Sequence, residues 1–437
     1  MKKMLFATAL LAGVGMMSSC SSDEVAGLNA PESPATGSDL VPVELALNGP
    51  SVSVEKRGIG TIGDIDGEEG NVWKGEKLRL IMMRRSEADG ATWDFSNWSY
   101  TPDAPGGPVT EYNFANLEVT TPNGQASGKL TWDATDPKYY PNEGIHDFFA
   151  YNIDNAMYKG TGFEDTTPDY TEDGDNSNFI LKDNETTDQK YVWFKIDGSQ
   201  DLMAGIAVND PETTGTNLGF SAATARDGKT PKITMQHLLT RFTFQVYPAN
   251  TSAEGIIVTG ITVKSKTTGK MIVAYDLGQG KTAPESLISF ELPEGSEPAV
   301  EEPVALVLKD RDAANTNVKD LVAVTLANGQ TSEAPANIGH ALMVAPGETE
   351  YEMTITLKQT FTDSEGGNEA TGTTTVTRMI NIPSATVEEG EADATAQPGS
   401  SYNVKVKVYG MEKIEVEAEL TGWKDGGDID IDTNLTE

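Results

Sequence analysis

An all-β protein with two tandem β-sandwich domains is the fold that this sequence predicts. Short segments in which apolar and polar residues alternate recur along the 437-residue chain, and no long amphipathic helix pattern interrupts them. The 43 glycines and 22 prolines, with many Thr, Val, Asp and Asn residues, favour turns and strands over helices. The length suffices for two to three domains. We expect an N-terminal domain at residues 41–229 and a C-terminal domain at residues 230–437.

Residues 1–19 form a leader that resembles the signal peptide of a lipoprotein. Two lysines precede an apolar run at residues 4–17, which is too short to span a membrane, and two serines then lead to Cys20. Met17 stands where such signals usually carry Leu, so an aliphatic side chain is still present. The resemblance implies that Cys20 is acylated, and residues 20–40 then read as a flexible tether between lipid and folded body.

Residues 41–47 (VPVELAL) are the first expected strand, because apolar residues occupy every second position. Pro42 indicates a place at a sheet edge or at the start of the strand. A stretch rich in Gly and Asp follows, and it contains the basic dipeptide Lys56-Arg57 directly before Gly58. An exposed loop of this kind is readily cut by an Arg-specific protease.

Five further strands are expected in the N-terminal domain. They lie at residues 77–85, 130–132, 146–151, 191–196 and 202–208. Residues 158–187 are polar and acidic, and residues 209–229 read as the link between the domains. Trp93, Trp98 and Tyr100 lie in a turn-rich stretch, where they serve either packing or a sugar-stacking platform.

The segment at residues 231–248 combines two alternating runs. Ile233 and Met235 are apolar at odd positions, whereas Phe242, Phe244 and Val246 are apolar at even positions. A change of parity needs an extra residue, so we expect a bulge or a short turn between residues 237 and 239.

The C-terminal domain is expected to contain many short strands. They lie at residues 255–265, 270–277, 287–292, 304–308, 321–326, 340–344, 350–357, 373–382, 402–409 and 414–420. The last two strands alternate most clearly. Their apolar positions are Tyr402, Val404, Val406 and Val408, then Ile414, Val416, Ala418 and Leu420.

The charge and the side-chain chemistry exclude several functions. A net charge of −35 argues against nucleic acid and anionic membrane surfaces as partners. The single cysteine allows no intrachain disulfide and no cysteine-based zinc site. The Gly pattern at residues 58–63 and the acidic runs at 173–178 and 425–432 lack the context of nucleotide or EF-hand calcium sites, so they read as loops. We expect no enzyme, no catalytic or metal-binding residues and no cofactor.

The run MQHLLTRFTFQV at residues 235–246 resembles a central strand of the fimbrillin family, the subunits of type V pili. Cys20 with its acidic flank and the cleavage motif at Arg57 extend the resemblance. It implies transthyretin-like sandwich domains and a surface lipoprotein of the outer membrane. It also implies a cut between Arg57 and Gly58 that removes lipid, tether and first strand together.

The same resemblance implies polymerisation with other pilus subunits by strand exchange, location in the fimbrium after maturation, and adhesion to a host or bacterial surface receptor. Removing residues 41–47 would open a sheet edge and an apolar groove for a neighbour's strand. Residues 402–420 have the alternation of donor strands, and they equally suit ordinary strands of the second sandwich.

A surface glycan-binding lipoprotein of the starch-utilisation type is the alternative function. It shares the anchor, the tether and the tandem sandwiches. It differs in requiring exposed, coplanar aromatic side chains and no processing at Arg57. An enzyme such as a β-sandwich glycosidase ranks third, because no pair of acidic residues can be singled out as acid and base.

Overall fold

The structure is a computed structural model. It describes residues 41–47, 73–86, 114–158, 182–208, 219–293, 300–311, 317–362, 369–383 and 395–421, apart from residues 126, 136, 142–143, 157, 184–187, 279 and 412. All of them belong to the unit Pro34–Glu437. Their regular structure is almost entirely strand, with one α-helix, α1 (Ala222–Arg226), and one short 3-10 turn, η2 (Thr251–Ala253), among the described residues. The all-β class predicted from the sequence is confirmed.

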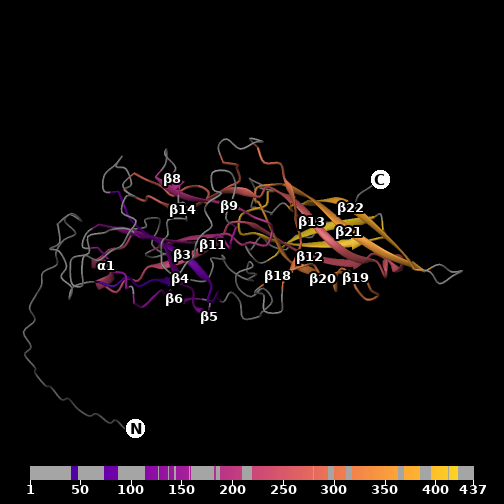
Figure 1. Cartoon of the computed structure of the whole chain (residues 1–437), viewed down its shortest axis with the longest axis horizontal. Helices are drawn as coiled ribbons and strands as arrows, with labels where there is room; N and C mark the ends of the chain where they lie inside the picture. Colours follow the sequence, from indigo (N-terminus) through magenta and orange to yellow (C-terminus); the bar gives the residue numbers. More distant parts are fainter. Residues whose placement is uncertain are drawn as a thin grey trace, which may run out of the picture. The chain divides into compact units, whose positions relative to one another are not determined.

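A seven-stranded sheet takes its members from distant parts of the chain (Figure 1). Its strands are, in spatial order, β4 (Phe114–Thr120), β3 (Lys77–Arg84), β7 (His146–Asn152), β10 (Met203–Val208), β11 (Lys232–His237), β1 (Ala46–Leu47) and β6 (Gly128–Lys129). Only β1 and β11 run parallel in this sheet, and the other neighbouring pairs are antiparallel.

Two further sheets pack face to face in the second half of the chain. One has the order β20 (Ala336–Val344), β12 (Thr240–Pro248), β23 (Ser401–Val408) and β24 (Ile414–Thr421). The other has the order β16 (Val304–Val307), β13 (Ile257–Ser265), β21 (Glu350–Thr362) and β22 (Glu369–Asn381), with β19 (Val324–Thr325) also on β13. Phe242 of β12 meets Tyr351 of β21 edge to face, with ring centroids 5.1 Å apart.

A small four-stranded sheet and two strand pairs complete the described fold. The sheet has the order β15 (Ile288–Ser289), β14 (Thr268–Tyr275), β9 (Gln189–Lys195) and β8 (Lys182–Asp183). The pairs are β17 (Asp310–Arg311) with β18 (Val318–Lys319), and β2 (Trp73–Lys74) with β5 (Asn123–Gln125). No described helix has the length and apolar character needed to cross a lipid bilayer.

Two apolar cores share the seven-stranded sheet. The first core lies on one of its faces and includes Leu45, Leu80, Phe148 and Ile233. The second core includes Ile81 and Phe149 from the other face, and it continues into the sheets of the second half of the chain. Neighbouring residues of β3 and β7 therefore enter different cores. This explains why Lys77–Arg84 reads KLRLIMMR, a nearly continuous apolar run, because both of its faces are covered.

The central segment changes sheets where its alternation changes parity. β11 ends at His237 in the seven-stranded sheet, and β12 begins at Thr240 in the β20–β12–β23–β24 sheet. Leu238 and Leu239, which lie between them, are both buried in the second core. The strand is interrupted at residues 238–239, within the stretch where a bulge or a short turn was expected. The cause is a crossing between two sheets that alternation alone does not reveal.

Several expected strands differ in length from the structure. β20, β21 and β22 are longer than predicted, and α1 lies inside the loop expected at residues 209–229. The hydroxyl and amide of Ser221 and Thr224 form a reciprocal capping box that stabilises the start of this short helix. Two sheets join strands from both sides of the boundary expected at residue 229, through β10–β11 and β9–β14. The division into domains stays a prediction.

Candidate functional site

The first strand lies in the interior of the seven-stranded sheet, between β11 and β6. On one side Ala46 and Leu47 pair in parallel with Lys232 and Ile233 of β11. On the other side the same two residues pair antiparallel with β6. Pro42 makes an isolated antiparallel bridge with Tyr139 near the start of the segment, which agrees with the expected strand-start position.

Backbone hydrogen bonds continue upstream of β1 over most of residues 41–47. The N–H of Val43 donates to the carbonyl of Lys138 at 2.8 Å, and the carbonyl of Val41 accepts from Tyr140 at 2.9 Å. The carbonyl of Leu45 accepts from Leu130 at 2.9 Å. The backbone of the expected strand is thus hydrogen-bonded to neighbouring segments along most of its length, although only its last two residues form a regular strand of the sheet.

The apolar side chains of this segment belong to the first core. Val43 is 3% exposed, and Leu45 and Leu47 are fully buried, whereas Glu44 between them is exposed. Burying three such side chains contributes about 5–9 kcal/mol, at about 1.5–3 kcal/mol each. That amount is comparable with the whole stability of an ordinary domain. The place that residues 41–47 fill between β11 and β6 is called the slot. If it were empty, the fold would lose this stability, so a replacement strand would be strongly favoured.

Basic residues border the slot that residues 41–47 occupy. Lys129, Lys138 and Lys232 each stand on a backbone that is bonded to the segment or paired with it. Lys129 makes an ion pair of 2.7 Å with Glu44, and both side chains are more than half exposed, so the pair itself adds little stability. Lysines therefore stand on both sides of the segment, and local positive charge in a chain of net charge −35 favours an acidic strand in this place.

The first expected donor strand is deeply buried in its own sheet. β23 lies between β12 and β24, parallel to β12 and antiparallel to β24. Val404, Val406 and Val408 are fully buried and Tyr402 is 4% exposed. Withdrawing β23 would break two strand ladders and open the second core. Its geometry therefore favours the role of an ordinary strand.

The second expected donor strand lies at a sheet edge. β24 pairs only with β23 in the described sheet. Ile414 and Ala418 are buried and Val416 is partly buried, while Leu420 lies opposite Tyr402 in the ladder. Its three glutamates occupy the intervening positions, with Glu419 2.7 Å from Lys405. Withdrawing β24 would break only one ladder.

Other expected site residues lie outside the part of the chain that the structure describes. These are Cys20, Arg57 and Gly58, together with Trp93, Trp98 and Tyr100. Acylation, cleavage and a platform at these aromatics stay predictions. Within the described residues, no group of three His, Cys, Asp or Glu side chains is placed to hold a metal ion.

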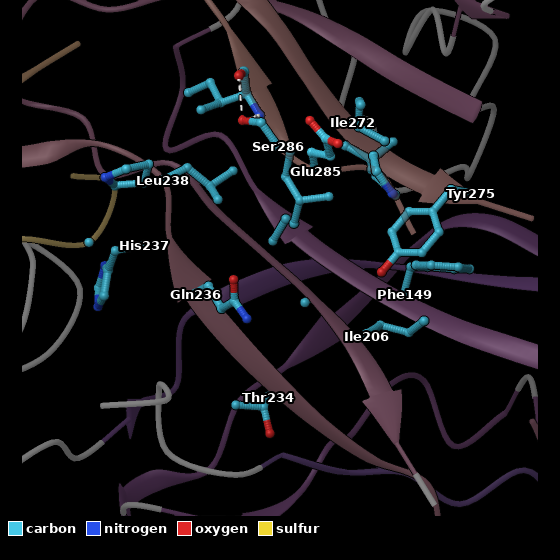
Figure 2. A pocket seen from close by; sticks show the side chains of 18 residues that line it. Phe149, Ile206, Thr234, Gln236, His237, Leu238, Ile272, Tyr275, Glu285 and Ser286 are labelled. Carbon is cyan, nitrogen blue, oxygen red and sulfur yellow. Dashed lines mark hydrogen bonds between the residues drawn. The ribbon is translucent and has the colours of Figure 1, made fainter. Parts of the chain in front are cut away.

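A cleft of about 590 Å³ lies against β10 and β11, and Figure 2 shows the side chains around it. Ile206, Thr234 and Gln236 line it from these strands, and the segment before β15 lines it from another direction. Nδ1 of His237 lies 3.0 Å from both carboxylate oxygens of Asp201, a contact internal to the fold. Alternation within single segments could not reveal this cleft, because its lining comes from separate strands and loops.

One aromatic group on the small sheet bears on the glycan-binding alternative. The rings of Tyr191 and Trp193 on β9 meet at 85°, and the ammonium group of Lys270 lies about 5 Å from both ring centroids. Tyr158 is tilted at 45° to Trp193. Flat stacking on a sugar needs an open, coplanar face, and these rings do not form one.

Comparisons with known proteins give structural neighbours only. No model of a known protein family matches this sequence, and no curated protein matches it. A solved protein with a proposed role in cell adhesion, from Bacteroides uniformis, is 14% identical with a TM-score of 0.40, covering 87% of this chain and 98% of its own.

Two fimbrial proteins from Porphyromonas gingivalis are also similar to this chain. The anchor protein Mfa2 is 10% identical with a TM-score of 0.29, covering 87% of this chain and 99% of its own. The tip protein Mfa3, solved with a C-terminal truncation, is 12% identical with a TM-score of 0.32, and the covered shares are again 87% and 99%.

Proposed function

We propose that this protein is a structural subunit of a cell-surface pilus. It is exported as a lipoprotein acylated at Cys20, matured by cleavage after Arg57 and polymerised by strand exchange. The observation that carries the proposal is the interior position of residues 41–47, whose apolar side chains fill the first core upstream of a protease-sensitive motif. A strand with this position is removable only if another strand replaces it.

Cleavage at Arg57 would separate the first strand from the rest of the chain. Arg57 follows Leu47 by ten residues, and β2 begins at Trp73. After the cut, residues 41–47 would be held only by hydrogen bonds and apolar contacts. A neighbouring subunit at high local concentration could then displace them. Contacts between subunits that do not close into a ring would extend into a filament.

β24 of a neighbouring subunit is the donor that this site favours. Ile414, Val416 and Ala418 repeat the spacing of the apolar residues in the slot. The intervening glutamates would face the basic border of the slot, where Glu44 already pairs with Lys129. β23 would stay in its own subunit, because its removal would break two strand ladders, whereas the removal of β24 would break one.

The N-terminal mass of protein sheared from the cell surface tests the maturation step. We expect a chain that begins at Gly58, because an Arg-specific protease cuts after the basic residue. An Arg57→Ala variant should instead begin at acylated Cys20 and should form no polymer. Polymer of normal length from the Arg57→Ala variant would contradict the proposal.

A peptide test separates strand exchange from cleavage. A chain that begins at Gly58 should gain several degrees in Tm when a peptide of residues 413–421 is added, because a ligand that binds only the folded state stabilises it. The same peptide with Val416→Asp keeps its glutamates and loses its apolar face, so it should have no effect. Equal effects of the two peptides would exclude this donor.

The glycan-binding alternative makes the opposite prediction for the first experiment. It expects acylated Cys20 with Arg57 intact, a result that also fits a pilus anchor. A glycan array then distinguishes the two, since only the glycan-binding lipoprotein should retain sugars. Pilus subunits, a surface receptor and, before maturation, the outer membrane are the partners that the proposed function implies.

A further inference from the structure

The exposed apolar side chains of the described chain gather on one segment. Of its six exposed large apolar residues, five lie between residues 300 and 322, and the sixth is Met379. The five are Val300, Val304, Val307, Val318 and Val322. Val304 and Val307 are 46% and 50% exposed and belong to β16. Clustered exposed apolar side chains mark interaction surfaces more often than isolated ones do.

β16 is also an unprotected sheet edge. It pairs with β13 on one side, and no described strand pairs with its other side. The edge strands of the described sheets with at least four strands all contain a polar or charged residue, except β16, which reads VALV. Examples are Glu118 in β4, Lys129 in β6 and Arg378 in β22. Charged edges prevent pairing with other chains, and β16 lacks this protection.

We propose that β16 pairs antiparallel with β16 of a second copy of this chain about a two-fold axis. The charges that flank the strand are self-complementary. Glu301 and Glu302 precede it, and Lys309 and Arg311 follow it with Asp310 between them, so one end is acidic and the other is net basic. An antiparallel copy brings the acidic end of one strand to the basic end of the other. A parallel copy would instead place like charges together.

The centre of the pairing follows from the same charges. Residues opposite each other in an antiparallel pair lie on the same face of the sheet, so a two-fold pairing of one strand is centred on a residue. With Ala305 at the centre, Glu301, whose carboxylate also accepts hydrogen bonds from Thr267 and Thr268 of its own copy, lies opposite Lys309 of the second copy. With Leu306 at the centre, Glu302 would lie opposite Asp310, a like-charge pair that offsets the opposite-charge pair of Glu301 with Arg311. The pairing is therefore centred on Ala305.

The contact is weak and separate from strand exchange. With Ala305 at the centre, Val304 to Leu306 lie opposite the same three residues of the second copy, and Val307 lies opposite Pro303, which has no N–H to donate. So small an interface is typical of transient association. The test uses the uncleaved chain, in which residues 41–47 still fill the slot, so its outcome does not depend on the proposed function.

Disulfide trapping tests the predicted centre. Ala305→Cys in a Cys20→Ser background should form a thiol-reducible dimer on mild oxidation, because opposite Cβ atoms in a sheet are about 4.5–5.5 Å apart. Ala370→Cys is the matched control, since Ala370 is exposed on β22 at the opposite edge of the same sheet. A monomeric Ala305→Cys chain, or equal cross-linking of both variants, would overturn the proposal.

Sedimentation velocity tests the pairing of two β16 edges without introducing a cysteine. The weight-average mass of the uncleaved chain should rise with concentration between about 1 µM and 1 mM, a range that spans weak affinities. The double variant Val304→Lys, Val307→Lys should stay monomeric with an unchanged Tm, since both side chains are exposed. Met379→Lys should associate like the native chain. Association of the double variant at the native level would also overturn the proposal.

Discussion

His146 is fully buried at the start of β7, where its main chain pairs with Phe220. Neither ring nitrogen has a hydrogen-bond partner among the described residues. Burial, together with the nearby charge of Arg84, lowers the pKa of His146 to about 3. Burial in the same way lowers the pKa of His340 to about 4. Both imidazoles are therefore neutral in the folded protein at pH 7.

The His146 side chain should make the free energy of unfolding depend on pH. The unfolded chain takes up a proton near pH 6.5 and the folded chain does not, so stability is full above that pH and is lost as pH falls toward about 3. Between pH 7 and pH 5 the loss from this group is about 2 kcal/mol.

Urea unfolding of a His146→Leu variant at pH 7, 6 and 5 measures this loss. Leu leaves no unpaired ring nitrogen and no titration, so the dependence of stability on pH should flatten by the stated amount. All other charges are common to both proteins and cancel in the comparison. An identical pH dependence in the two proteins would show that His146 is not the group responsible.

Elements of this fold are stabilised by neighbours that are distant in sequence. Residues 41–47 contact β11, β6 and the stretch around Lys138–Tyr140, none of which is adjacent in the chain. β3 is held in the same way between β4 and β7. Such a segment cannot be stable by itself, because an isolated strand has no partner for its backbone groups.

The first strand should tolerate change on its outer face and not on its inner face. Leu45→Ala should lower the free energy of unfolding of the uncleaved chain by about 2–5 kcal/mol, because a cavity opens in the first core. Glu44→Ala should cost less than about 1 kcal/mol, since its ion pair with Lys129 is exposed. Urea unfolding of both variants is the measurement, and equal losses would contradict the described burial.

The whole molecule carries a net charge of −35. Ion pairs such as Lys264 with Glu352 at 2.8 Å and Lys405 with Glu419 at 2.7 Å offset only part of it, because 67 acidic residues face 32 basic ones. Excess charge of one sign keeps a protein soluble and opposes its compact state through self-repulsion. Added salt should therefore raise the stability of the entire chain, because it screens this self-repulsion.

Raising NaCl from about 10 mM to about 0.5 M at pH 7 should raise Tm, because the screening length falls from about 30 Å to a few ångströms. The rise should be the same in KCl at equal ionic strength, since it depends on screening and not on the ion. Differential scanning calorimetry is the measurement. A Tm that stays constant or falls would show that self-repulsion does not limit stability.

The alternation of apolar and polar residues along single segments predicts those features of the structure that depend on one strand at a time. It predicts the all-β class, the inward-facing residues of residues 41–47 and of β23, and the interruption after His237. Each of these depends on which face of one strand is apolar, and a period of two residues records that directly. The composition and charge likewise follow from the residues alone.

The neighbours of each strand could not be predicted in the same way. That β11 and β12 belong to different sheets, that residues 41–47 lie between β11 and β6, and that β16 is an open edge all depend on pairing between distant segments. Backbone groups pair without regard to side-chain identity, so many partners are compatible with one alternating pattern. Packing of the two cores selects among them, and that selection is a property of the folded chain as a whole.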